Sequence, residues 1–143
     1  MPSRRQERRT AIDILYQADI TDDVPMDVLR GWDEAGREIT TFTRALVEGV
    51  AEHQPVIDLL LEEHAQGWSV ARMTALDRTI LRVAVEEIRY RVDVPDAVAI
   101  SEAVEAASEL SEEDAKRFVN GILGRIAREG DPSSLESPVD PPA

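Results

Sequence analysis

The chain has 143 residues, with 29 acidic and 16 basic side chains, a formal net charge of −13 and no cysteine. A chain of this length folds as one domain, and the lack of cysteine excludes disulfides and thiolate metal sites. It has no apolar run long enough to cross a membrane, and its arginine-rich start lacks the pattern of a signal peptide. We therefore expect a cytoplasmic protein.

The charges are unevenly distributed along the chain. Residues 1–20 hold four arginines against three acids, and residues 111–130 hold four cations against four acids, whereas residues 21–110 hold 19 acids against eight bases. Such polarity favours a protein that binds RNA with one face and a basic protein with another. An acidic middle section that only keeps the protein soluble is the alternative.

Apolar residues repeat with helical periodicity, and no alternating strand pattern lasts. The pattern predicts seven helices, at about residues 3–19, 24–35, 37–53, 55–65, 75–91, 97–109 and 112–128. Pro55 opens the fourth helix, Asp23 and Asp96 can cap the second and sixth, and Thr74 and Ser111 begin capping boxes for the fifth and seventh. The fifth helix is apolar around more than half of its circumference, which predicts a central position.

These helices define an all-α, single-domain fold over residues 1–130. Residues 131–143 are acidic and rich in proline, and we expect this tail to be disordered.

Arginines are concentrated at the start of the first helix, at Arg4, Arg5, Arg8 and Arg9. Cations at a helix N-terminus oppose the helix dipole, at a cost of about 0.3–1 kcal/mol for each well-placed charge. A function such as RNA binding explains them better than stability does. The alternative is a solvated, frayed and idle charged face.

An aromatic side chain beside cations marks the last helix. Phe118 projects from the margin of the apolar arc, next to Lys116 and Arg117. Such a ring can stack on an unpaired RNA base, and the alternative is a phenylalanine that seals the edge of the core.

Three further residue types have structural explanations. Asp77 occupies the third helical position of its capping box, and capping accounts for it. Glu87 lies inside the apolar arc of the same helix, so we expect an arginine partner: Arg72, Arg78 or Arg82. The two tryptophans, Trp32 and Trp68, are expected to pack rather than to bind ligands.

The sequence gives no sign of an enzyme, a cofactor or a metal site. The two histidines, His53 and His64, form no Glu-x-x-His pair, and no glycine-rich phosphate loop follows a strand.

An ordered series of motifs resembles the NusB family of bacterial transcription antitermination factors over about residues 4–128. After an arginine-rich opening, the matching segments are Leu15-Tyr16, Phe42-x3-Leu46-Val47-x-Gly49-Val50, Ile57-Asp58, Trp68-x3-Arg72, Asp77-Arg78-x-Ile80-Leu81-Arg82, Pro95, Val98-x-Ile100-x-Glu102-Ala103-Val104-Glu105 and Phe118-Val119-Asn120-Gly121. One departure is Ser101, where an asparagine is usual before Glu102.

The resemblance implies a three-helix N-terminal half packed on a four-helix C-terminal half. It implies binding of single-stranded boxA RNA in ribosomal RNA leaders, together with the small-subunit ribosomal protein NusE, within the RNA polymerase antitermination complex. RNA contacts would come from the arginine segment and from Lys116, Arg117 and Phe118, and NusE contacts from Tyr16 and Asp77. A monomer and a homodimer are both compatible with the sequence. The competing hypothesis is a helical protein–protein adaptor that does not bind RNA.

Overall fold

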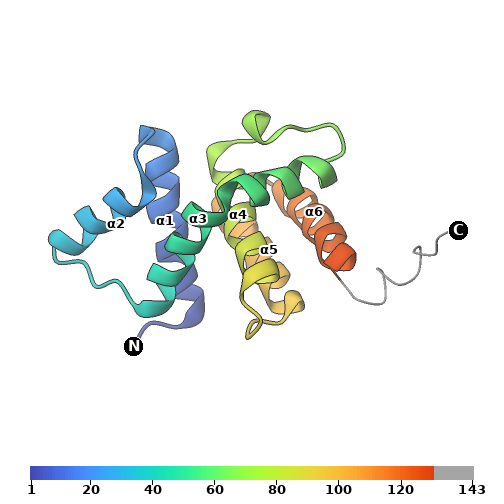
Figure 1. The fold of residues 1–143 in the computed structure, drawn as a ribbon. Coiled ribbons are helices and arrows are strands. Elements are labelled where there is room, and N and C mark those ends of the chain that lie inside the picture. The colour runs from blue at the N-terminus through green and yellow to red at the C-terminus, as the bar shows by residue number, and fades with distance from the viewer. Residues whose placement is uncertain (131–143) are drawn as a thin grey trace, which may run out of the picture.

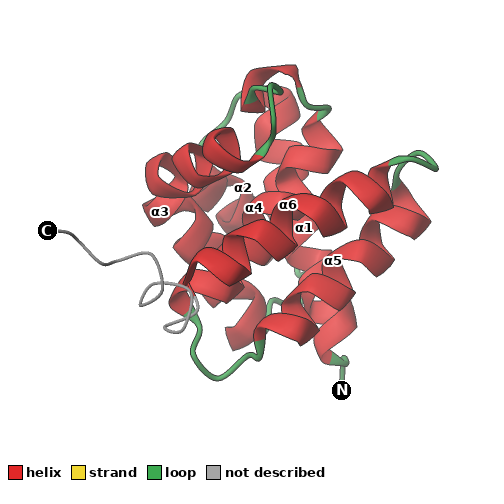
Figure 2. Cartoon of the chain, turned by 90° about the vertical axis from the view of Figure 1, so that its right-hand side faces the viewer, coloured by secondary structure: helices red, strands yellow, loops and turns green. Residues whose placement is uncertain are grey.

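The computed structural model describes residues 1–130, which form six α-helices and one 3-10 turn (Figures 1 and 2). The helices are α1 (Arg4–Thr21), α2 (Pro25–Glu34), α3 (Thr41–His64), α4 (Ala75–Tyr90), α5 (Asp96–Leu110) and α6 (Ala115–Gly130), and the 3-10 turn covers Val70–Arg72. The predicted all-α class is confirmed. None of the helices in this part of the chain is long and apolar enough to cross a membrane. The predicted tail, residues 131–143, lies outside the described residues.

Helix α3 connects the two halves of the fold. Figure 1 shows α1 and α2 on one side, α4, α5 and α6 on the other, and α3 running between them. Helix α3 contacts α1, α2, α4 and α6. Helix α4 contacts α1, α3, α5 and α6, so the predicted central position of this helix is confirmed.

The prediction of a helix boundary at Pro55 is wrong, because α3 continues through this residue. Proline lacks the N–H group for one hydrogen bond within the helix, at a cost of about 3 kcal/mol. Leu46 and Val50 before it and Ile57 and Leu61 after it are all fully buried. Burial of this continuous apolar stripe offsets the local cost, and two predicted helices become one.

Among the predicted caps, only Thr74 acts as expected. Its hydroxyl accepts the backbone N–H of Asp77 at 3.1 Å. Helices α2 and α5 begin after Val24 and Pro95, which offer no side-chain cap. The prediction that Asp23 caps α2 is therefore wrong, because the N-cap residue is Val24, one position later.

Asp96 and Ser111 also take other roles than the predicted ones. Asp96 is the first residue of α5 rather than its cap. Ser111 closes α5, since its N–H donates to the carbonyl of Ala107, and α6 begins only at Ala115. The Ser111 hydroxyl donates instead to the carboxylate of Asp77 at 2.6 Å, and this charge-assisted bond is stronger than a cap to a neutral N–H.

Gly49 makes room for a buried carboxylate between α3 and α4. A Cβ atom at this position would lie 2.0 Å from Oε2 of Glu86. Glu86 is buried, and its other oxygen lies 2.8 Å from Nδ1 of His53. Burial raises the pKa of Glu86, against the opposing effect of His53. The ring of His53 in turn stacks on Tyr90, with centroids 3.6 Å apart.

We predict that Gly49→Ala destabilises the protein by about 1–3 kcal/mol, because the added methyl group displaces Glu86 from its contact with His53. Gly31→Ala is the matched control, since a Cβ atom added at this position of α2 would have no neighbouring atom within 4 Å. That change should stabilise the protein by about 0.5–1 kcal/mol through helix propensity. Urea unfolding measures both, and equal effects of the two substitutions would contradict the packing role of Gly49.

Candidate nucleic-acid interface

The arginine segment lies on an ordered helix end. The hydroxyl of Ser3 accepts the N–H of Gln6 at 3.1 Å, and the side chain of Gln6 accepts the N–H of Ser3 at 2.8 Å. This reciprocal capping box satisfies two N–H groups at the start of α1. The four arginines are therefore held on a formed helix, which disfavours the interpretation of a frayed segment.

Each arginine of the segment has a carboxylate partner within the protein. The pairs are Arg4 with Glu7 at 2.7 Å, Arg5 with Glu102 at 2.9 Å, Arg8 with Glu87 at 2.9 Å, and Arg9 with Glu109. The positive charge that the sequence concentrates at this helix start is thus largely compensated in three dimensions. These partners cannot be predicted from local sequence, because three of the four acids belong to distant helices.

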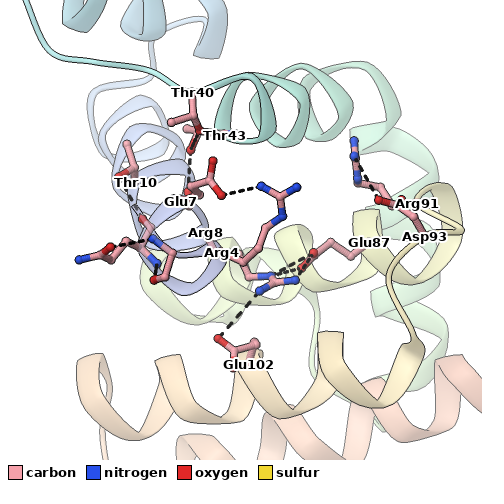
Figure 3. Close-up of polar contacts among 12 residues, drawn as sticks. Arg4, Glu7, Arg8, Thr10, Thr40, Thr43, Glu87, Arg91, Asp93 and Glu102 are labelled. Atoms are coloured by element: carbon pink, nitrogen blue, oxygen red, sulfur yellow. Dashed lines mark hydrogen bonds and ion pairs between the residues drawn. The ribbon is translucent and has the colours of Figure 1, made fainter. Parts of the chain in front are cut away.

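The pair between Arg8 and Glu87 is buried (Figure 3). Nε of Arg8 donates to both carboxylate oxygens of Glu87, at 2.9 and 3.0 Å, and the two side chains are only 10% and 1% exposed. A second carboxylate, that of Glu102, lies 4.0 Å from Nη1 of Arg8. The Arg8 guanidinium is therefore enclosed by the protein, in contrast to that of Arg5, which is 53% exposed.

Glu87 has an arginine partner, as predicted, but the partner is Arg8, and the three predicted candidates, Arg72, Arg78 and Arg82, are wrong. Arg78 donates to Asp19 at 2.7 Å, and Arg82 donates to Asp58 at 2.9 and 3.0 Å. The physical reason is the antiparallel packing of α1 on α4, which brings residue 8 beside residue 87 and residue 19 beside residue 78. Local spacing within α4 contains no information on this pairing.

The first turn of α6 presents a second group of cations. Lys116 and Arg117 are exposed, and neither forms an ion pair with any side chain of residues 1–130. Phe118 is partly buried and packs against the edge of the core, as its position on the apolar arc predicts. Its ring meets that of Trp68 edge to face, with centroids 6.4 Å apart.

A pocket of about 280 Å³ opens beside this turn. Trp68 and Phe118 form one part of its lining, and Asp77 and Ser111 form another. The prediction that Trp68 only packs is incomplete, because 54% of its surface is exposed and it lines this pocket. Its place between Gly67 and Ser69, in a loop, is the sequence signal for that exposure.

The two predicted partner-binding residues lie toward the same end of the α1–α4 pair. Tyr16 is 38% exposed, and one turn further along α1 Asp19 bonds to Arg78, the residue after Asp77. Asp77 is partly buried, and its carboxylate accepts the hydroxyl of Ser111. Asp77 thus has a structural bond in addition to its exposure to the pocket.

Comparison with known proteins agrees with this fold and these motifs. The model of the NusB family matches residues 5–128, and the chain belongs to this family. The transcription antitermination protein NusB of Salinispora arenicola is 46% identical over 131 residues, which cover 89% of this chain and 96% of that protein. The NusB protein of Saccharopolyspora erythraea is 46% identical over 136 residues, covering 92% and 90%. The resemblance seen in the sequence is confirmed.

Solved structures show the same fold. NusB of T. maritima superposes with a TM-score of 0.82 at 30% identity, over 94% of this chain and 98% of that one. A chain from the complex of the antitermination factors NusB and NusE with dsRNA superposes with a TM-score of 0.78 at 25% identity, over 88% and 96%.

We predict that Arg8→Ala destabilises the fold by about 3–5 kcal/mol, because it leaves the carboxylate of Glu87 buried without a partner. The double substitution Arg8→Met with Glu87→Leu should recover most of this loss, since it removes both charges and keeps the volume. The control is Arg30→Ala, whose ion pair with Asp27 is exposed on both sides. Denaturant unfolding compares the three variants, and similar losses for Arg8→Ala and Arg30→Ala would refute a structural role for the buried pair.

Proposed function

We propose that this protein is a transcription antitermination factor that binds single-stranded, boxA-like RNA together with NusE and joins the RNA polymerase antitermination complex. The observation that carries the proposal is the aromatic pair of Trp68 and Phe118, which lines a pocket, together with two cations on the same helical turn as Phe118 that form no ion pair with residues 1–130. Membership of the NusB family and likeness to a NusB chain solved with NusE and dsRNA support it.

The first turn of α6 supplies the two kinds of contact that unpaired RNA requires. An aromatic ring can stack on any of the four bases, and cations bind the neighbouring phosphates of the RNA backbone. Phe118 provides the ring, with Trp68 beside it, and Lys116 and Arg117 provide the cations. The start of α1 adds Arg4, Arg5 and Arg9 as a second phosphate-binding segment.

Arg8 has a different part in this proposal from the other three arginines. Its guanidinium is enclosed by Glu87 and Glu102, so it fixes α1 in position and orients its neighbours. Direct contact of Arg8 with RNA stays a prediction, and it would require the buried pair to open.

NusE binding is assigned to the surface that includes Tyr16 and Asp77. The chain carries a net charge of −13, and an acidic surface attracts a basic ribosomal protein. The proposed mechanism is assembly of RNA and proteins in the cytoplasm, without a chemical step.

The pairing of all four arginines favours a second candidate, an adaptor that binds proteins only. In that case the arginines serve folding, and Phe118 seals the core edge where it packs. The two candidates differ in what truncation of Phe118 does to RNA affinity.

We predict that Phe118→Ala lowers RNA affinity by about 1–3 kcal/mol, because it removes a stacking platform. This loss should persist at high salt, whereas the smaller loss in Lys116→Ala should shrink as salt rises, since only the cation releases counterions from RNA. Fluorescence titration with a boxA-like oligoribonucleotide at two salt concentrations, with and without NusE, measures both. A duplex RNA of the same sequence tests whether unpaired bases are needed.

Thermal unfolding of Phe118→Ala is the control for stability. Because the side chain is only partly buried, the cost should stay below the roughly 3–5 kcal/mol of a fully buried phenylalanine. Unchanged RNA affinity in a folded but clearly destabilised variant would support the adaptor instead.

We also predict that Asp77→Ala weakens NusE binding and lowers stability by about 1 kcal/mol, because it removes a carboxylate that lines the pocket and the bond from Ser111. Ser111→Ala removes the same bond but keeps the carboxylate, so it should lower stability and leave NusE affinity unchanged. Calorimetric titration with NusE separates the structural role of Asp77 from its role in binding NusE. If both variants bind NusE like the parent, Asp77 is only a structural residue of α4.

A further inference from the structure

Three glutamates form a row on α5 that faces the arginine segment of α1. Glu102, Glu105 and Glu109 follow the i, i+3, i+7 spacing of one helix face. Glu102 binds Arg5 through two bonds, of 3.1 and 2.9 Å, and Glu109 binds Arg9. Hydrogen bonding from Arg5 lowers the pKa of Glu102, and hydrogen bonding from Arg9 lowers the pKa of Glu109. We call these three residues the acidic row.

Two members of the acidic row, Glu102 and Glu109, occupy donors that a phosphate would use. A carboxylate and a phosphate both accept two parallel N–H bonds from a guanidinium, so they compete for the same pair of donors. A phosphate at the remaining Nη edge would lie close to the carboxylate, which repels it. Arg5 already donates hydrogen bonds from Nε and Nη2 to Glu102. A phosphate therefore makes full contact with Arg5 or Arg9 when it displaces the carboxylate bound there.

We propose that the acidic row of α5 is an internal competitor of RNA, which holds Arg5 and Arg9 in the free protein and exchanges them for phosphates on binding. This inference rests on the proposed RNA-binding function and adds a regulatory contact to it. The contribution of these arginines to RNA affinity is then the difference in free energy between their pairs with phosphates and their pairs with the glutamates.

The pairs of Arg5 and Arg9 are weak enough to exchange. The side chains of Arg5 and Glu102 are 53% and 18% exposed, and those of Arg9 and Glu109 are 25% and 48% exposed. Ion pairs in contact with water contribute little to stability, and a phosphate can replace the carboxylate.

Helix α1 itself need not move during this exchange. Arg8 is held by Glu87 in the core, and the hydroxyl of Thr43 donates to the backbone carbonyl of Glu7 at 2.9 Å. These two contacts fix the backbone from which the neighbouring arginines project. The exchange is therefore a change of side-chain position on a fixed helix.

The contrast with α6 gives the order of events. Lys116 and Arg117 have no carboxylate partner in the described part of the chain, so they attract RNA without competition. Arg5 and Arg9 add their contacts only to an RNA that reaches them and displaces the acidic row. An RNA that contacts α6 alone gains nothing from them.

The experiment is a titration of a boxA-like single-stranded oligoribonucleotide into Glu109→Gln. Loss of the competing carboxylate should tighten binding about twofold to fivefold, the range expected for one exposed ion pair. Glu48→Gln is the matched control, because it makes the same change in net charge at an exposed position of α3 whose side chain forms no ion pair within residues 1–130. Its affinity should equal that of the parent.

A double-mutant cycle distinguishes competition from general repulsion of RNA by a nearby acid. In an Arg9→Ala background, Glu109→Gln should no longer tighten binding, because the arginine that Glu109 holds is already absent. A gain of the same size in both backgrounds would overturn the proposal, and so would no gain in the parent background.

Failure of this inference can be told apart from failure of the proposed function. If Phe118→Ala weakens RNA binding but Glu109→Gln changes nothing, RNA binding stands and the internal competitor is refuted. If the parent protein binds no RNA with or without NusE, both are refuted.

Discussion

The buried pair of Arg8 and Glu87 is the constraint on which the arrangement of α1 depends. A carboxylate that is 1% exposed in the middle of an apolar helix is tolerable only with a charged partner, and the partner comes from a helix 79 residues away in sequence. This requirement fixes the register between α1 and α4. It also determines which arginines point into the protein and which remain at its surface.

From that register follows the distribution of charge over the molecule. Arg5 and Arg9 flank Arg8 and meet α5, whose fully buried residues are all alanines: Ala99, Ala103, Ala106 and Ala107. The adjoining, partly exposed face of the same helix carries the glutamates that bind these arginines. A segment that is strongly basic in the sequence is thus close to neutral in the fold, and the first turn of α6 becomes the better-exposed source of positive charge.

Periodicity was sufficient to predict the helical class and the central place of α4, because both depend on which residues share a face of one helix. It could not predict that α3 passes through Pro55, since the compensating burial comes from other helices. The marginal position of Phe118 followed from the helical wheel. The helical wheel could not predict the ion pairs of the arginines or the bond from Ser111 to Asp77. These contacts join residues that only tertiary packing brings together.

The space beside Gly49 has a consequence for the coupling of folding to protons. Burial raises the pKa of Glu86, so the folded chain binds the proton of this carboxyl group more tightly than the unfolded chain does. The resulting stabilisation is complete below the ordinary pKa of glutamate and is lost as pH rises through the raised pKa of the folded state. Glu102, whose pKa is lowered by Arg5, acts in the opposite sense: its contribution is lost as pH falls below the ordinary pKa of glutamate. Together these two carboxylates favour the folded state most in mildly acidic solution, close to the point where a free glutamate is half ionised.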